Sequence, residues 1–208
     1  MLMQRGQNPP PKQLFRLNAL HGYNHPRMKK LNDILRFNKS FVKKKGYKSF
    51  VTDRFPDKRM VILTCMDTRL TELLPKALNL RNGDAKIIKN AGAIVSHPFG
   101  SVMRSILVAV YNLKADTILV IGHHNCGMTG LKAGTILKQA PKRGIRKKDI
   151  QAISRLGVNL EEWLTGFRNV RTGVKQSIEI IKAHPLLPPK VKVYGFIIHP
   201  KTGKLEKV

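Results

Sequence analysis

The sequence has few acidic residues, two cysteines, one tryptophan and no long hydrophobic run. None of its apolar runs approaches the ~20 residues that a membrane-spanning helix needs, and the N-terminus lacks the apolar centre of a secretory signal. Each cysteine, Cys65 and Cys126, stands in a motif typical of metal ligands, which argues against a disulfide between them. This use of cysteine indicates a reducing compartment, so we expect a cytoplasmic protein.

The shortage of acidic residues gives the chain a formal net charge of +27, from 39 Lys and Arg against 12 Asp and Glu. The excess lies on the flanks, because residues 61–140 have a nearly ordinary balance. Two explanations stay open: a solvated basic surface, or a surface that binds RNA or another polyanion weakly. The segments 43–45 and 142–148 are the best candidates for such binding, although neither has the interleaved aromatic residues that stack on single-stranded bases.

Two motifs contain both cysteines. The first, Cys65-Met66-Asp67-Thr68-Arg69, follows the apolar run 60–63, and the second, His123-His124-Asn125-Cys126, follows the run 117–121. Such runs are typical of buried strands in a parallel sheet, and open α/β sheets place their sites at the carboxyl ends of the strands. Two thiols and an imidazole, from His123 or His124, would there form a three-ligand set that suits zinc.

Both motifs resemble those of the β-class carbonic anhydrases, and Asn90-Ala91-Gly92 resembles a supporting segment of that family. The resemblance runs from about Leu31 to the C-terminus and is closest to the compact bacterial and archaeal branch. It implies an α/β fold with a central, mostly parallel β-sheet flanked by helices, and a homodimer or a dimer of dimers. It also implies a Zn2+ ion bound by Cys65, His123 and Cys126. The implied reaction is the reversible hydration of CO2 to bicarbonate and a proton through zinc-bound hydroxide (a carbonate dehydratase, or lyase).

Asp67 and Arg69 are the predicted catalytic residues. An ionised Asp67 would accept a hydrogen bond from the hydroxide, and Arg69 would pair with the carboxylate and keep it off the metal. The resemblance implies in addition that Asp67 can swing in as a fourth metal ligand in a closed state. Gly92 is predicted to support the substrate pocket through close backbone approach. Asn125 departs from the family, in which Asp is common at this position. Hydrolysis of CS2 or COS at the same site, and a zinc-stabilised RNA-binding protein without activity, stay open as alternatives.

The chain is predicted to form a single domain over residues 28–208. Residues 1–27 contain no acidic residue and a run of three prolines, so we expect a poorly ordered basic extension, with Met28 as an alternative start. The helical predictions are a helix from Leu31 to near Gly46, a helix over 101–113 capped by Ser101, and a long helix over 160–184 with Trp163 in the core. Residues 141–150 are predicted to be a solvated connector, and the last strand to span 191–198 before a turn at 201–204.

Overall fold

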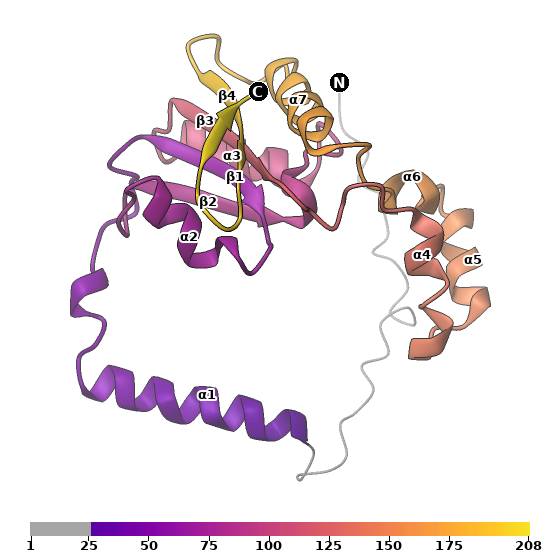
Figure 1. Cartoon of the computed structure of the whole chain (residues 1–208), viewed down its shortest axis with the longest axis horizontal. Helices are drawn as coiled ribbons and strands as arrows, with labels where there is room; N and C mark the ends of the chain where they lie inside the picture. The colour runs from indigo at the N-terminus through magenta and orange to yellow at the C-terminus, as the bar shows by residue number, and fades with distance from the viewer. Residues whose placement is uncertain (1–25) are drawn as a thin grey trace, which may run out of the picture. The chain divides into compact units, whose positions relative to one another are not determined.

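The computed structural model describes residues 26–208, and the chain divides between Val51 and Thr52 into two compact units (Figure 1). The prediction of a poorly ordered extension concerns residues 1–27, of which 1–25 lie outside the described residues. The predicted domain over residues 28–208 stays a prediction. Between residues 26 and 208, no helix combines the length and the apolar character that crossing a membrane requires.

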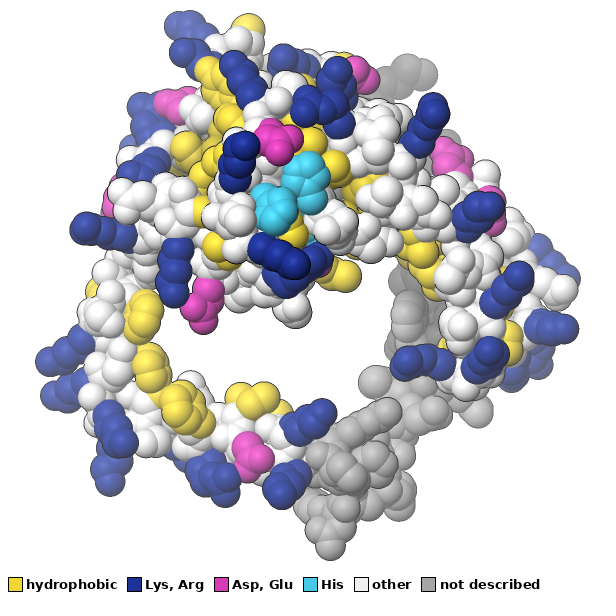
Figure 2. All heavy atoms as spheres, in the orientation of Figure 1, with side chains coloured by type: hydrophobic (Ala, Val, Ile, Leu, Met, Phe, Trp, Pro, Cys, Tyr) yellow, Lys and Arg dark blue, Asp and Glu magenta, His cyan; other side chains and the backbone are white. Residues whose placement is uncertain are grey.

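The first unit contains α1 (Pro26–Lys43) and the 3-10 helix η2 (Lys48–Phe50). The helix begins at Pro26 rather than at Leu31, because proline fits the first turn, where its missing N–H has no intrahelical partner to lose. Apolar side chains of α1 are exposed, among them Ile34 at 65% and Phe37 at 72%. Figure 2 shows yellow side chains along this helix, with dark blue Lys and Arg side chains beside them.

The second unit contains a five-stranded sheet in the order β2-β1-β3-β4-β5, which confirms the predicted α/β class. Its strands are β1 (Met60–Cys65), β2 (Ala85–Asn90), β3 (Thr117–His123), β4 (Lys192–Ile198) and β5 (Leu205–Lys207). The first four strands are parallel to one another, and β5 runs antiparallel to β4. The sequence predicts the turn at 201–204 but not β5, which pairs Leu205 with Ile198 after that turn.

Helices cover both faces of the sheet. Val61 and Leu63 of β1 pack in one buried cluster with α3 (Ser101–Tyr111) and α7 (Val170–Lys182), whereas Ile62 packs in a second cluster with α2 (Leu70–Ala77). Successive side chains of a strand point to opposite faces, so a strand covered on both faces must be apolar throughout. This explains the continuous apolar runs of β1 and β3.

The structure overturns several local predictions. The segment 141–150, predicted to be a connector, contains η4 (Pro141–Arg143) and the start of α5 (Lys147–Arg155). It comes after α4 (Ala133–Leu137) in the chain. The predicted helix over 160–184 is two helices, α6 (Leu160–Leu164) and α7, because Asn169 accepts a hydrogen bond from the backbone N–H of Thr172 and starts a new helix. Trp163 is 66% exposed on the short α6 rather than in the core. Gly100, not Ser101, is the N-cap residue of α3.

Candidate metal centre

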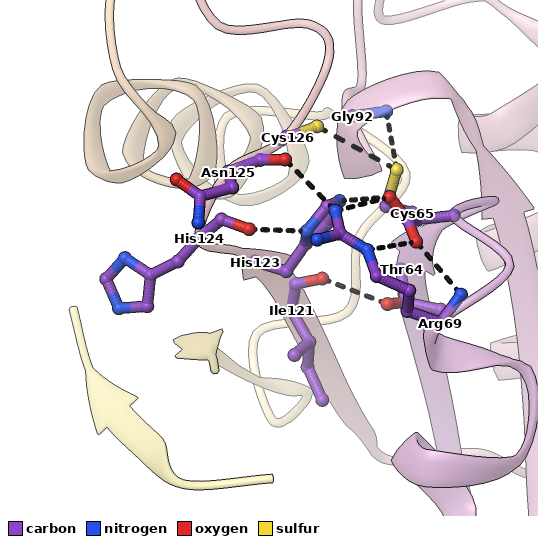
Figure 3. Close-up of polar contacts among 10 residues, drawn as sticks. Thr64, Cys65, Arg69, Gly92, Ile121, His123, His124, Asn125 and Cys126 are labelled. Atoms are coloured by element: carbon purple, nitrogen blue, oxygen red, sulfur yellow. Dashed lines mark hydrogen bonds and ion pairs between the residues drawn. The ribbon is translucent and has the colours of Figure 1, made fainter. Parts of the chain in front are cut away.

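Two neighbouring strands bring the two motifs together. Cys65 is the last residue of β1 and His123 the last of β3, and the two strands are in parallel register with Thr64 opposite Ile121. The buried hydroxyl of Thr64 donates a hydrogen bond of 3.0 Å to the carbonyl of Ile121 and joins the strands directly before the site. Cys126 follows in the loop after β3. Cys65, His123 and Cys126 therefore meet at the carboxyl edge of the sheet (Figure 3).

The three side chains form a compact and buried cluster. Their ligand atoms all lie within 4.8 Å of one another, and the two sulfur atoms are 3.9 Å apart. Two sulfurs on one tetrahedral zinc ion lie about 3.8 Å apart, given Zn–S bonds of about 2.3 Å. The residues therefore match the spacing of a tetrahedral metal site.

His123 presents one ring nitrogen to this cluster. Its Nδ1 lies 2.9 Å from the carbonyl of His124, which fixes the ring, while its buried Nε2 has no hydrogen-bond partner among the described residues. A buried nitrogen without a partner is costly, and a metal ion would satisfy it. His124 instead points away from the sulfur atoms (Figure 3), and its Nε2 lies 3.3 Å from Oε1 of Glu206. The structure thus brings His123 rather than His124 to the two thiols.

The two thiols differ in the direction in which their pKa values are shifted. The pKa of Cys65 is lowered, mainly by its hydrogen bond with Cys126. The pKa of Cys126 is raised, mainly by the same hydrogen bond. The backbone N–H of Gly92 also donates to the Cys65 sulfur, at 3.4 Å. A bound divalent ion would favour the thiolate form of both cysteines.

Asp67 and Arg69 form a two-pronged ion pair beside the cluster. Arg69 donates from Nε to Oδ1 at 2.9 Å and from Nη2 to Oδ2 at 2.8 Å, and its backbone N–H donates to Oδ1 at 2.9 Å. These bonds, led by those of the guanidinium, hold the pKa of Asp67 far below its usual range. Because Oδ2 lies 3.8 Å from Nε2 of His123, the ionised carboxylate borders the ligand cluster while Arg69 holds it.

Gly92 lies against the cluster at a point where a side chain would not fit. It stands in the 3-10 helix η3 (Ala91–Ala93) with a φ of +85°. A Cβ atom there would lie 2.9 Å from side-chain atoms of Ile94 and Phe167 and 3.0 Å from Cγ of Met128. Phe167 belongs to the same buried cluster as both cysteines, and the partly buried Ile94 and Met128 pack against that cluster. The backbone N–H of Gly92 therefore lies close to the Cys65 sulfur, and the role of Gly92 in a substrate pocket stays a prediction.

Two supporting interactions escaped the sequence analysis. Ser177 of α7 is fully buried, and its hydroxyl accepts a hydrogen bond from the backbone N–H of Val95 at 3.1 Å and lies 2.9 Å from the carbonyl of Gly173. It fixes the chain that follows Gly92, but a lone serine in a helix gives no sequence signal. In addition, Arg69 donates from Nη2 to the carbonyl of Asn125 at 3.1 Å. A backbone acceptor of this kind leaves no mark on the sequence.

The fold and the cluster define an α/β protein with a candidate metal centre at the carboxyl edge of its sheet. The family model for carbonic anhydrase matches residues 60–205, which include both motifs. The chain therefore belongs to the β-class carbonic anhydrase family, and the predicted enzyme class is confirmed.

Three similar proteins illustrate the range of the family. YvdA of Bacillus subtilis (strain 168), whose name places it among the carbonic anhydrases, is 56% identical over 181 residues, covering 87% of this chain and 92% of YvdA. A carbon disulfide hydrolase of Saccharolobus solfataricus is 31% identical over 163 residues, covering 73% of this chain and 78% of that protein. The crystal structure of β-carbonic anhydrase isoform I from Trichomonas vaginalis matches with a TM-score of 0.78 at 30% identity, covering 85% of this chain and 96% of that one.

Proposed function

We propose that this protein holds a Zn2+ ion with Cys65, His123 and Cys126 and catalyses the reversible hydration of CO2 to bicarbonate and a proton. The observation that carries the proposal is the buried, unpartnered Nε2 of His123 beside two thiol sulfurs 3.9 Å apart. Two thiolates favour zinc over magnesium or calcium. Held by these three protein ligands, the ion would lower the pKa of a water molecule toward ~7 and so supply a nucleophile at neutral pH.

Asp67 is proposed to orient the attacking water. The carboxylate is ionised and lies next to the ligand atoms, so it can accept a hydrogen bond from the water and direct a free electron pair toward the carbon of CO2. Arg69 holds both carboxylate oxygens, which favours the open arrangement over one with Asp67 as a fourth ligand. To reach that closed arrangement, Asp67 would have to give up its contacts with Arg69.

The surroundings of the thiols suit a small neutral substrate. Ile94, Met128 and Phe167 pack around Gly92, whose N–H contacts the Cys65 sulfur, and none of the three side chains carries a charge. Desolvating CO2 against such a wall costs little, whereas an anion would lose strong interactions with water there. This arrangement favours CO2 as the molecule that approaches the site and bicarbonate as the molecule that leaves toward water.

Stopped-flow measurement of CO2 hydration tests the proposal on protein that contains about one zinc ion per chain, at pH ~7 and ~8.5. We expect activity that rises with pH and is lost in Cys65→Ser. Thr64→Ser serves as the control, because it alters the neighbouring buried residue but keeps the hydroxyl that bonds to Ile121. No hydration at either pH with zinc in place would refute the proposed reaction.

Hydrolysis of CS2 is the second candidate, because the relative from Saccharolobus solfataricus bears that name at 31% identity. The same zinc-loaded protein should be supplied with CS2 and the release of hydrogen sulfide measured. Release of sulfide that greatly exceeds the rate of CO2 hydration would make CS2 the better substrate. Sulfide release at the rate of a Cys65→Ser control would exclude this candidate.

The predicted partners stay predictions. A homodimer or a dimer of dimers is supported by the exposed apolar side chains of α1, such as Ile34 and Phe37, which a second copy could cover. Light scattering coupled to size-exclusion chromatography would measure the mass of the assembly in solution.

Polyanion binding is supported by the net charge alone, and it should weaken with salt at a log–log slope of about −0.9 per phosphate contact on duplex DNA. The absence of RNA binding at low salt would refute it. The cytoplasmic location also stays a prediction.

A further inference from the structure

Asn125 has an unusual backbone conformation inside the loop that carries two of the three ligands. Its φ is +54°, in the left-handed region that most residues with a side chain avoid. Asn and Asp enter this region more readily than other L-residues because their short polar side chains bond locally. The side chain of Asn125 is exposed, and its backbone carbonyl accepts the 3.1 Å hydrogen bond from Arg69.

This conformation accounts for the way the loop presents its side chains. His123 and Cys126 are buried and face the Cys65 sulfur, whereas His124 between them turns outward to Glu206. An extended chain would alternate its side chains, and a continued helical turn would leave the strand in another direction. A left-handed residue directly before Cys126 turns the backbone so that this thiol returns to the side of His123.

Arg69 holds the turned backbone in place. Its Nη2 donates both to Oδ2 of Asp67 and to the carbonyl of Asn125, so one guanidinium joins the loop after β1 to the loop after β3. The position of Cys126 relative to Cys65 therefore depends on a residue that is itself not a ligand.

We propose that Asn125 is a positioning residue for the metal, acting through its left-handed backbone and its carbonyl rather than through its side chain. The inference rests on the proposed zinc site. It explains why Asn can stand where the family resemblance leads one to expect Asp, because both residues accept the left-handed conformation. Asn125→Asp and Asn125→Gly should therefore bind zinc as tightly as the unaltered protein does. Asn125→Val should bind zinc more weakly.

Competition of each purified protein with a chelator of known zinc affinity measures this effect without reference to activity. We expect Asn125→Val to weaken zinc binding roughly five- to thirtyfold, the range that corresponds to the cost of a left-handed L-residue. Asn125→Ala, a milder change, covers the case in which the valine variant does not fold. Asn79→Val is the matched control, because Asn79 is also exposed with a φ of +52° but lies after α2. It should lower the melting temperature of the metal-free protein and leave zinc affinity unchanged.

Each other outcome overturns the inference in a recognisable way. Unchanged zinc affinity in both Asn125→Val and Asn125→Ala would show that the left-handed turn does not position the ligands. Equal weakening in Asn125→Gly and Asn125→Val would assign the effect to the side chain. Weakening in Asn79→Val of the same size would reduce it to general destabilisation. If the unaltered protein takes up no zinc, the proposed function fails and the inference with it, whereas the first three outcomes leave the proposed function standing.

Discussion

Replacing Gly92 by alanine should destabilise the protein far more than the same change at another glycine of similar backbone conformation. The left-handed φ of +85° should cost an alanine about 1–2 kcal/mol. The added Cβ would also press on Phe167, Ile94 and Met128 at 2.9–3.0 Å, and overpacking of this kind costs about 1–3 kcal/mol. The ring of Phe167 cannot retreat freely, because its other atoms already lie against Gly173. The sum is about 2–5 kcal/mol.

Gly144→Ala is the matched control for Gly92→Ala. Gly144 has a φ of +89°, and a Cβ there would meet no atom of the described chain within 4 Å, so the change should cost the backbone term alone, about 1–2 kcal/mol. Urea denaturation of the two metal-free variants gives the difference in free energy of unfolding. Zinc competition adds a second readout, because the N–H of Gly92 contacts the Cys65 sulfur. Equal destabilisation by the two substitutions would refute the close packing at Gly92.

Three further predictions concern the polar residues of the site. Asp67→Asn should lower the rate of CO2 hydration roughly 10- to 1000-fold while zinc content stays unchanged, and unchanged turnover in a zinc-loaded variant would remove the proposed role. His123→Asn should abolish zinc binding in metal analysis, whereas His184→Asn, at another buried histidine, should lower the melting temperature and retain zinc. Because the folded-state pKa of Asp67 is depressed, its ionised pair with Arg69 stabilises the metal-free protein above pH ~4 and loses this effect as the pH falls further. The difference in melting temperature between the metal-free protein and Asp67→Asn should therefore be constant from neutral pH to ~4 and become smaller below pH ~4. A difference that stays constant at lower pH would contradict the lowered pKa of Asp67.

The sequence was sufficient to predict the sheet and the meeting of the motifs because both depend on short-range patterns. Residues 60–63 and 118–121 are apolar at every position, which two-sided burial requires, and each run leads into a motif. Parallel strands end at one edge, so Cys65, His123 and Cys126 had to come close once β1 and β3 were neighbours. The pairing of β1 with β3 is therefore enough to bring the three predicted ligands together.

The errors arose where distant parts of the chain decide the local structure. The amphipathic pattern over 160–184 continues through residues 165–169, but a Cβ at Gly166 would overlap the carbonyl oxygen of Met128, and its N–H donates to the carbonyl of Leu131. The chain therefore leaves the helix to pack on the loop beyond Cys126. The same pattern predicts Trp163 in the core, but Trp163 is exposed on the short α6, where the predicted helix is interrupted.

Two strand ends alone do not make the candidate site. Some of the groups that hold it, such as Ser177, lie outside both cysteine motifs, and others, such as the carbonyl of Asn125, belong to the backbone. Ser177 on α7 fixes the segment after Gly92, whose N–H reaches the Cys65 sulfur, and the carbonyl of Asn125 is fixed by Arg69. Arg69 at the same time holds Asp67. A displacement of Arg69 would therefore alter the Asp67 carboxylate and the ligand loop together, so the orientation proposed for the attacking water and the spacing of the thiols depend on the same side chain. This coupling gives a physical reason for Arg to stand two residues after Asp67, since the one ammonium nitrogen of Lys could not reproduce the separate Nε and Nη2 bonds to two carboxylate oxygens and a carbonyl.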